Sequence, residues 1–468
     1  RLVINYTGHG STDLWAHELV FVRQTSIPQL INKNRYPFVT IASCALARWD
    51  DPFNISAAEQ LVFIKDKGAV GISAAVMPVY SIPNAIYNNK LYDNLFKADT
   101  LEKRLRLGKA IYNVKQELYY DNDMKFALIG DPSLRLGLPQ YRTRIDSINN
   151  VPGNSLLEMK ALQKVKIFGS VLKSDSTFWN NFNGELDIRV LDVDKNIVML
   201  DFGYQFSFRQ PGGAIYSGKA TVANGLWNVE FVVPRDISYN TGRGKMLIYF
   251  NDNSVDGLGY SDNFIMNGID TTAAPDSTGP NISVFLDNRN FRSGDLVNQS
   301  PKLIVDFFDE NGLNLTGSIG HKIEAVLNDN TNQKIDLTGL YTSTSGYQNG
   351  SLEYAFENLP DGNHKLEITA WDTYNNYSST IVDFQVKSTG DLALDEVYNF
   401  PNPMRDATTF MFQHNFDESI EARILIYTTA GRLIKELNKS NITDKFVSID
   451  WDCKDNDGDY IANGTYIY

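Results

Sequence analysis

The spacing of apolar residues changes once along the chain, near residue 140, and this change constrains the fold more than any other feature. Before it, short apolar runs at residues 2–6, 38–43 and 69–73 alternate with segments of helical period. After it, short alternating strands recur between Gly, Asn and Asp turns, with almost no helical period. The sequence therefore predicts an α/β domain with a largely parallel sheet, followed by all-β modules.

Two local patterns predict helices in the first domain. Ser56-Ala-Ala-Glu59 has the form of a capping box that starts a helix, and Gly68 is expected to end that helix. A later helix is expected to bury one face. The residues of that face recur at helical spacing: Leu107, Ile111, Val114 and Leu118.

Two breaks divide the all-β part into three modules. Residues 270–280 form a small-residue linker with two prolines, and Ser388-Thr-Gly390 forms the second break. The chain opens and closes inside apparent strands, so we expect the first domain to be the C-terminal part of a larger one. The predicted domains are 1–140 (α/β), 141–275 and 276–388 (Ig-like β-sandwiches) and 389–468 (a smaller Ig-like β module).

Composition limits the classes of function. The formal net charge is −13, and nucleic-acid binding draws on clustered Lys and Arg, so no nucleic-acid partner is expected. Aromatic residues make up 12% of the chain, enough to build cores, which excludes global disorder. The two cysteines, Cys44 and Cys453, lie in segments of different character, so we expect no disulfide framework. The sequence has no run of 18 apolar residues, so no transmembrane helix is predicted.

One cysteine and one histidine follow two neighbouring predicted strands. His9 and Cys44 each come directly after an apolar run, and adjacent parallel strands would place both at the same sheet edge. A cysteine nucleophile needs a base that takes its proton. The glycines around His9 allow a sharp turn that leaves the Gly10 amide free, so this amide and that of Cys44 could face a developing oxyanion.

Spacing alone leaves other interpretations open. A cysteine at a strand end is commonly a small core residue, and Gly-His-Gly can be a simple turn. His17 is a rival base, in a segment that we expect to form a loop or a short helical turn. Trp15 is a candidate for the substrate-binding wall, with ordinary packing as the alternative.

The first 140 residues resemble the gingipain family of cysteine peptidases, whose sheet is caspase-like. The matching segments are Tyr-Thr-Gly-His-Gly-Ser at 6–11, Ala-Ser-Cys at 42–44, Gly-Ala-Val-Gly at 68–71 and Ile-Gly-Asp-Pro-Ser at 129–133, with Trp15 between the first two. The resemblance implies that Cys44 is the nucleophile, that His9 is the general acid and base, and that the Gly10 and Cys44 amides form the oxyanion hole. Residues 45–51 depart from the secreted peptidases, so their specificity pocket is not carried over, and no third catalytic residue can be placed.

The terminal module resembles type IX secretion C-terminal signal domains, which are FlgD-like Ig modules, in segments such as 398–403 and 463–466. Together the two ends of the chain resemble the sortase branch of the gingipain family. The resemblance implies an enzyme, exported to the outer face of the outer membrane, that cleaves the C-terminal signal domain from cargo proteins. It would then join the cargo to anionic lipopolysaccharide through a Cys44 thioester.

The same resemblance implies the partners. These are cargo proteins with type IX signal domains, the lipopolysaccharide acceptor and a PorV-like outer-membrane barrel that would bind residues 389–468. No cofactor or metal is expected, and the acidic loop at 452–459 is interpreted as a polar hairpin turn because Cys453 breaks the calcium-loop pattern. Two alternatives stay open: a secreted endopeptidase of the gingipain type, and a non-enzymatic surface adhesin with an inactive peptidase fold.

Overall fold

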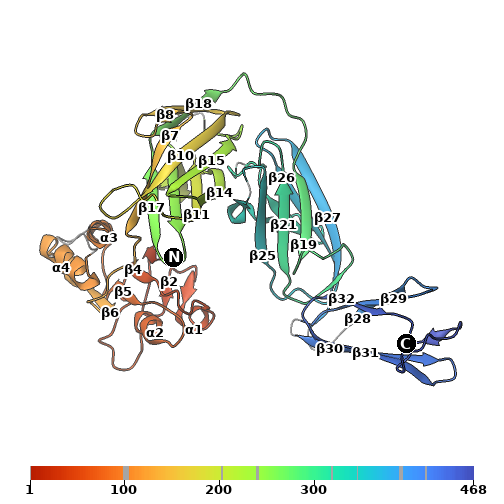
Figure 1. The fold of residues 1–468 in the computed structure, drawn as a ribbon. Helices are drawn as coiled ribbons and strands as arrows, with labels where there is room; N and C mark the ends of the chain where they lie inside the picture. The colour runs from red at the N-terminus through yellow and green to blue at the C-terminus, as the bar shows by residue number, and fades with distance from the viewer. Residues whose placement is uncertain are drawn as a thin grey trace. The chain divides into compact units, whose positions relative to one another are not determined.

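The computed structural model describes residues 2–97, 105–201, 204–238, 242–317, 320–344, 346–388, 394–416 and 419–468. The chain forms two compact units, Arg1–Pro139 and Gln140–Tyr468 (Figure 1). Within the described ranges, none of the helices has both the length and the apolar character needed to cross a bilayer.

A four-stranded sheet forms the centre of the first unit, in the order β1-β4-β5-β6. The first three strands are parallel, as predicted, and β6 at the edge is antiparallel to β5. Strands β4 and β5 are buried throughout. The strands of this unit are β1 (Val3–Thr7), β2 (Leu14–Trp15), β3 (Phe21–Val22), β4 (Phe38–Ala42), β5 (Gly71–Ala75) and β6 (Phe126–Gly130).

Helices cover both faces of this sheet. Successive residues of a strand point to opposite sides, so a strand that is buried throughout needs a core on each side. On β4, Phe38 belongs to the core beneath α3 and α4, whereas Val39 and Ile41 belong to the core beneath α2. The helices are α1 (Arg23–Ser26), α2 (Ala57–Phe63), α3 (Ser81–Leu95), α4 (Leu107–Glu117) and α5 (Asp121–Met124).

The predicted capping box is confirmed at the start of α2: the Glu59 amide donates to Ser56 Oγ, and the Ser56 amide donates to Glu59 Oε2. The predicted end of this helix was wrong. The helix stops at Phe63, and Gly68 lies beyond it with a positive φ of 95°. The apolar spacing of α4 is confirmed for Leu107, Ile111 and Val114, which are buried, whereas Leu118 is half-buried and follows the end of the helix.

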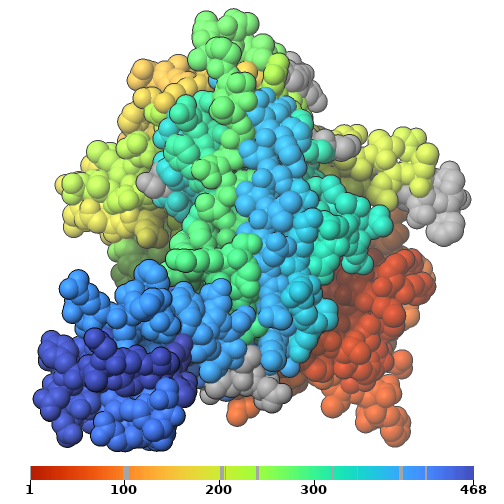
Figure 2. Space-filling model, turned by 90° about the vertical axis from the view of Figure 1, so that its right-hand side faces the viewer, coloured from red at the N-terminus to blue at the C-terminus, as the bar shows by residue number. Residues whose placement is uncertain are grey.

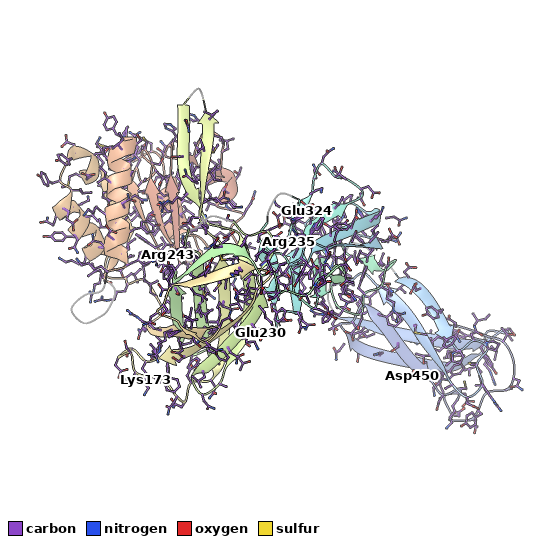
Figure 3. All side chains as sticks on the ribbon, turned by 90° about the horizontal axis from the view of Figure 1, so that it is seen from above. Lys173, Glu230, Arg235, Arg243, Glu324 and Asp450 are labelled. Carbon is purple, nitrogen blue, oxygen red and sulfur yellow. The ribbon has the colours of Figure 1, made fainter. Side chains whose placement is uncertain are left out.

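The second unit begins with a β-sandwich-like module. Seven strands in the order β15-β10-β7-β17-β16-β11-β14 surround one apolar core. Glu230 on β15, which is labelled in Figure 3, forms ion pairs with Lys164 and Lys166 on β10. The strands are β7 (Tyr141–Ile148), β8 (Val151–Pro152), β9 (Leu157–Ala161), β10 (Lys164–Leu172), β11 (Gly184–Leu191), β12 (Lys195–Asp201), β13 (Tyr204–Gln210), β14 (Ala214–Val222), β15 (Leu226–Val232), β16 (Lys245–Asn251), β17 (Asp256–Ser261) and β18 (Phe264–Ile269).

Two sheets enclose the core of the second module, one with β24-β25-β21-β19 and one with β20-β27-β26-β22-β23. Figure 2 shows the light-blue β26–β27 hairpin along one face. The first sheet continues that of the preceding module, because β24 pairs in parallel with β14. The strands are β19 (Asn281–Leu286), β20 (Leu296–Val297), β21 (Lys302–Phe308), β22 (Glu324–Leu327), β23 (Ile335–Asp336), β24 (Thr342–Ser343), β25 (Asn349–Ala355), β26 (Gly362–Trp371) and β27 (Tyr377–Val386), with a 3₁₀ turn at Thr338–Leu340.

The last module has two three-stranded sheets, β28-β29-β32 and β31-β30-β33, around two small apolar clusters. The predicted order, an α/β domain followed by β-sandwich-like modules, is confirmed. The module boundaries at residues 275 and 388 stay predictions. The strands are β28 (Leu394–Phe400), β29 (Thr408–His414), β30 (Ile420–Thr428), β31 (Leu433–Ile442), β32 (Phe446–Trp451) and β33 (Tyr466–Ile467).

Candidate active site

The parallel register of β1 and β4 places the predicted catalytic segments side by side. Thr7 and Ala42 are the last Cα partners of this strand pair. His9 and Cys44 each follow their strand by two residues, and the Gly8 amide donates to Ala42 O at 3.4 Å. Both residues therefore lie just beyond the carboxyl edge of the sheet, which is where α/β folds commonly hold their reactive groups.

The His9 segment is held by its own backbone carbonyl. His9 O accepts hydrogen bonds from Tyr6 Oη at 2.5 Å and from the Ala16 amide at 2.9 Å. The His9 and His17 rings stack with their centroids 5.9 Å apart, and both side chains are exposed. His17, the rival base, therefore lies beside His9, and position alone does not decide which of these two histidines is the base.

The Cys44 thiol is half-buried and points toward the loop that follows β5. Its Sγ donates to Val79 O at 3.4 Å, and the next amide, that of Ala45, donates to Met77 O at 3.3 Å. Within residues 2–97 the thiol forms no hydrogen bond with the His9 ring. Proton transfer from Cys44 to His9 therefore requires the thiol to leave Val79 O first.

Two backbone amides at this sheet edge have no acceptor among the described residues. Neither the Gly10 amide nor the Cys44 amide donates a hydrogen bond to any residue that the structure describes. The β-bridge between Gly10 and Trp15 uses the flanking amides of Ser11 and Ala16, which leaves the Gly10 amide free. Free amides beside a nucleophile are the groups that can stabilise a developing oxyanion.

Trp15 is placed by packing. Its ring stacks between Tyr6, at a centroid distance of 5.1 Å, and Phe21, at 4.5 Å. Its indole Nε1 is buried and has no acceptor in the described part of the chain. A role for Trp15 in substrate binding stays a prediction.

The sequence did not point to Ser43 or to the loop after β5. Ser43 is buried, and its hydroxyl has no hydrogen-bond partner among the described residues. Met77 and Tyr80 are exposed, and their loop contacts Cys44 through Val79. Exposed apolar side chains next to a nucleophile could contact a peptide substrate. The only sequence signal for these two residues was their position after a buried strand.

No described carboxylate forms a hydrogen bond with the His9 ring, so a third catalytic residue stays unassigned. Asp13 instead forms an ion pair with Arg23, with Oδ1 2.5 Å from Nε. The Asp13 carbonyl also accepts from the Arg23 amide at 2.8 Å, and Arg23 Nη1 donates to Gln60 Oε1 at 3.3 Å. These bonds fix the loop that carries Trp15 and His17 against α2.

Comparison with known proteins identifies the family that the first unit resembles. Residues 1–137 match the model of Peptidase family C25, which confirms a cysteine peptidase fold for this part of the chain. None of the curated proteins matches the chain.

Among solved structures, the chain is similar to dimeric latent PorU from Porphyromonas gingivalis, with 28% identity and a TM-score of 0.36. That match covers 80% of this chain and 36% of PorU, so the chain spans only about a third of the PorU length. The RgpB pro- and mature domains of Porphyromonas gingivalis match at 17% identity and a TM-score of 0.27, over 57% of this chain and 54% of that one. A bacterial ice-binding adhesin matches at 10% identity and a TM-score of 0.16, over 68% and 88%.

Proposed function

We propose that this chain, whose residues 1–137 match Peptidase family C25 and which is similar to PorU, is part of a cell-surface cysteine endopeptidase and transpeptidase. It would remove the C-terminal signal domain from type IX cargo proteins and join the cargo to anionic lipopolysaccharide. The observation that carries the proposal is the pair of free amides, Gly10 and Cys44, beside a thiol and an imidazole at one sheet edge.

The first acyl step forms a thioester. His9 takes the Cys44 proton, and the thiolate attacks the carbonyl carbon of the peptide bond before the signal domain. The new oxyanion faces the Gly10 and Cys44 amides. The C–N bond then breaks, His9 protonates the leaving amine, and the cargo acyl group stays on Cys44.

The second acyl step releases the cargo. An amine on lipopolysaccharide attacks the thioester carbon, a C–N bond forms, and the C–S bond breaks. The proton of the amine returns through His9 to the Cys44 sulfur. If water took the place of the amine, the product would be a free carboxylate, which is the outcome for a gingipain-type endopeptidase.

The proposed partners follow from the terminal module. A PorV-like outer-membrane barrel would bind residues 389–468 and hold the enzyme at the outer face of the outer membrane. The described part of this segment supports the idea only in that residues 394–416 and 419–468 form a β module with apolar clusters of its own. Such a module can present a surface to a partner without disturbing the peptidase unit.

The test is a pair of cysteine variants in the cells that make the protein. Cys44→Ala should leave cargo secreted with its signal domain attached and without lipopolysaccharide, as read by mass spectrometry. Cys453→Ala is the matched control, because Cys453 lies in the terminal module. Normal cargo maturation in the Cys44→Ala cells would overturn the proposal.

A trapping assay detects the thioester that both reactions share, because hydroxylamine at neutral pH converts a cargo thioester to a hydroxamate, in competition with hydrolysis. The cargo released without hydroxylamine then distinguishes the two reactions. An amide bond to lipopolysaccharide identifies the transpeptidase, whereas a free carboxylate identifies the hydrolytic alternative.

The hydrogen bond from Cys44 Sγ to Val79 O favours a second candidate, an inactive peptidase fold in a surface adhesin. In that case alkylation of Cys44 by iodoacetamide near pH 7 would be slow and would not change in a His9→Ala variant. Fast alkylation that depends on His9 would exclude this candidate.

A further inference from the structure

The peptide group that joins His9 to Gly10 carries one of the two free amides. Its carbonyl oxygen is His9 O, and its N–H is that of Gly10. The bond is trans, because the cis bonds of the described residues lie elsewhere. In a planar trans peptide group the C=O and the N–H point in opposite directions. The groups that bind His9 O therefore also set the direction of the Gly10 N–H.

Two donors bind this carbonyl from different elements. Tyr6 Oη, on β1, donates to His9 O at 2.5 Å, and the amide of Ala16, which follows β2, donates to it at 2.9 Å. The Gly10 N–H therefore points away from both donors. A rotation of the peptide group that turned this N–H toward Ala16 would break both hydrogen bonds.

The Tyr6 side chain is itself held in place. Its ring stacks on that of Trp15, with centroids 5.1 Å apart, and the loop closes so tightly over its hydroxyl that a Cβ atom at Gly8 would lie 2.7 Å from Oη. Burial, with the charge of Glu18, raises the pKa of Tyr6 above its ordinary value of about 10. The hydroxyl therefore keeps its proton and stays a donor near neutral pH.

The second donor comes from a less favourable backbone. Ala16 opens the turn between β2 and β3, and its φ is 60°; Leu19 in the same turn has a φ of 56°. Residues other than glycine adopt this left-handed conformation at a cost of about 1–2 kcal/mol each. Tyr6, which belongs to a strand of the central sheet, is therefore the firmer of the two supports for His9 O.

We propose that Tyr6 is a positioning residue of the active site, whose hydroxyl holds the His9–Gly10 peptide group in the orientation that the oxyanion hole needs. The inference rests on the proposed function and adds the residue that prepares its oxyanion hole. Donors that are oriented before the reaction stabilise the transition state without a reorganisation cost. Tyr6 acts only through the Gly10 amide, because its hydroxyl is bonded to the backbone.

Tyr6→Phe removes the hydroxyl and keeps the ring that stacks on Trp15. The peptide group can then rotate, so one oxyanion donor is misdirected in part of the molecules. We expect kcat for cargo cleavage to fall about 10–100-fold, somewhat less than for complete loss of a donor. KM should change by less than about twofold, because the donor acts on the transition state and not on the bound substrate.

The experiment uses the full protein and a purified cargo protein that carries its signal domain, and it adds a second readout. Iodoacetamide alkylates Cys44 by direct displacement of iodide, so this reaction forms no oxyanion and depends only on the thiolate and its base. Tyr6→Phe should therefore keep the alkylation rate near pH 7 within about twofold of the parent while kcat falls. A general disturbance of the site would lower both rates.

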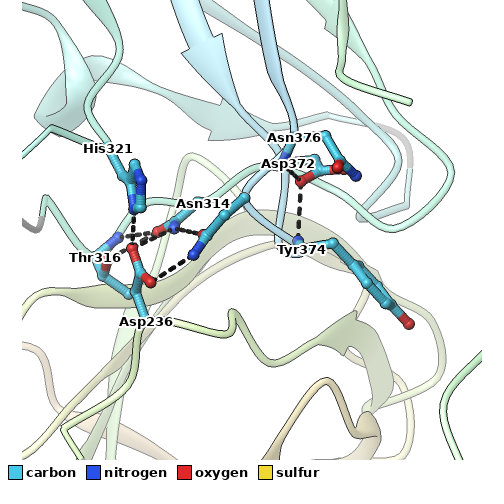
Figure 4. A network of polar contacts seen from close by, with 8 residues as sticks. Asp236, Asn314, Thr316, His321, Asp372, Tyr374 and Asn376 are labelled. Carbon is cyan, nitrogen blue, oxygen red and sulfur yellow. Dashed lines mark hydrogen bonds and ion pairs between the residues drawn. The ribbon is translucent and has the colours of Figure 1, made fainter. Parts of the chain in front are cut away.

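Two further variants keep the test decisive. Gly8→Ala retains Tyr6, but its Cβ atom would displace the hydroxyl from His9 O and should give the same pattern of reduced kcat and unchanged alkylation. Tyr374→Phe is the matched control and should equal the parent in both readouts. Figure 4 shows the Tyr374 ring directed away from the polar network around Asp236, and its hydroxyl forms no hydrogen bond with any residue that the structure describes.

The outcomes separate this inference from the proposed function. A parent that cleaves cargo, together with a Tyr6→Phe variant that keeps its kcat or loses kcat and alkylation equally, would overturn the inference alone. A parent that is alkylated quickly but releases no cargo would overturn the proposed function and the inference with it.

Discussion

Ser43 Oγ occupies the space in which a Cβ atom of Gly10 would lie. The contact joins the loop that carries His9 to the segment that carries Cys44, and a Cβ atom at position 10 would force the Ser43 side chain or the loop to move. The Ser43 hydroxyl, which has no hydrogen-bond partner among the described residues, therefore packs between the two segments that carry the free amides of Gly10 and Cys44. The oxyanion hole that we propose depends on this packing.

Gly10→Ala should push the His9 loop away from Ser43 and misplace one oxyanion donor. Loss of one such donor typically lowers kcat about 10²–10³-fold, and we expect a loss of this size in a cargo-cleavage assay. Gly137→Ala is the matched control, because nothing lies within 4 Å of a Cβ at Gly137. The double variant Gly10→Ala with Ser43→Ala should recover part of the activity; no recovery would contradict the packing argument.

His9→Ala and His17→Ala separate the two candidate bases. Loss of a general base costs about 10²–10⁴-fold in rate, so the His9 variant should lose at least that much kcat/KM. His17 stacks on His9 and should only hold the His9 ring in place, so the His17 variant should lose less than about tenfold in kcat/KM. A larger loss in the His17 variant would assign the base to His17 instead.

Thr143→Val should destabilise the first sandwich. Trp227 Nε1 donates to Thr143 Oγ1 at 2.7 Å, and Thr143 Oγ1 donates to Ser170 O at 2.8 Å, all in the buried core. Valine keeps the shape and leaves the indole N–H and a carbonyl unpaired, at a cost of about 1–3 kcal/mol in the free energy of unfolding. Urea unfolding measures this, and Thr221→Val at an exposed position on β14 should change it by less than about 0.5 kcal/mol.

Asp192 gives the first sandwich a pH-dependent stability. Burial raises the pKa of this carboxyl, although the amides of Val193 and Ser238 donate to it at 2.7 and 2.6 Å. The folded protein therefore holds a proton that the unfolded chain has lost, so the free energy of unfolding falls as the pH rises above about 4.

The loss of stability should appear as a fall in Tm between pH 4.5 and 7.5. Asp192→Asn should make this fall smaller. Asp175→Asn is the control, because hydrogen bonds from Thr177 lower the pKa of Asp175, and its titration lies below this range. Equal slopes in the parent and the Asp192 variant would show that other groups set the pH dependence.

Local patterns predicted much of the fold and part of the site. The capping box at Ser56 and the buried strand β4 are short-range features that depend on neighbouring residues. The antiparallel direction of β6 was not predicted, because a buried apolar run does not encode strand direction. The end of α2 at Phe63 was missed because the chain leaves the helix one turn before Gly68.

Long-range contacts were not visible in the sequence. The carboxylates of Asp276, Asp309 and Asp372 lie close together although full strands separate them in the sequence, and no local motif joins them. The contact between Gly10 and Ser43 depends in the same way on the β1–β4 register. The placement of His9 and Cys44 at one sheet edge was predicted because both residues follow predicted strands, and strand ends can be recognised from local sequence.

The parallel pair between Gly218 on β14 and Ser343 on β24 makes one hydrogen-bonded sheet out of strands from two modules. Ala214 packs against the core of the second sandwich, and Tyr347 packs against the core of the first. The two sandwiches are therefore connected by apolar contacts as well as by hydrogen bonds. A protease that nicked the exposed linker would therefore not release either half. The two fragments would stay together in solution and separate only in denaturant, so a gel under native conditions would show an intact species.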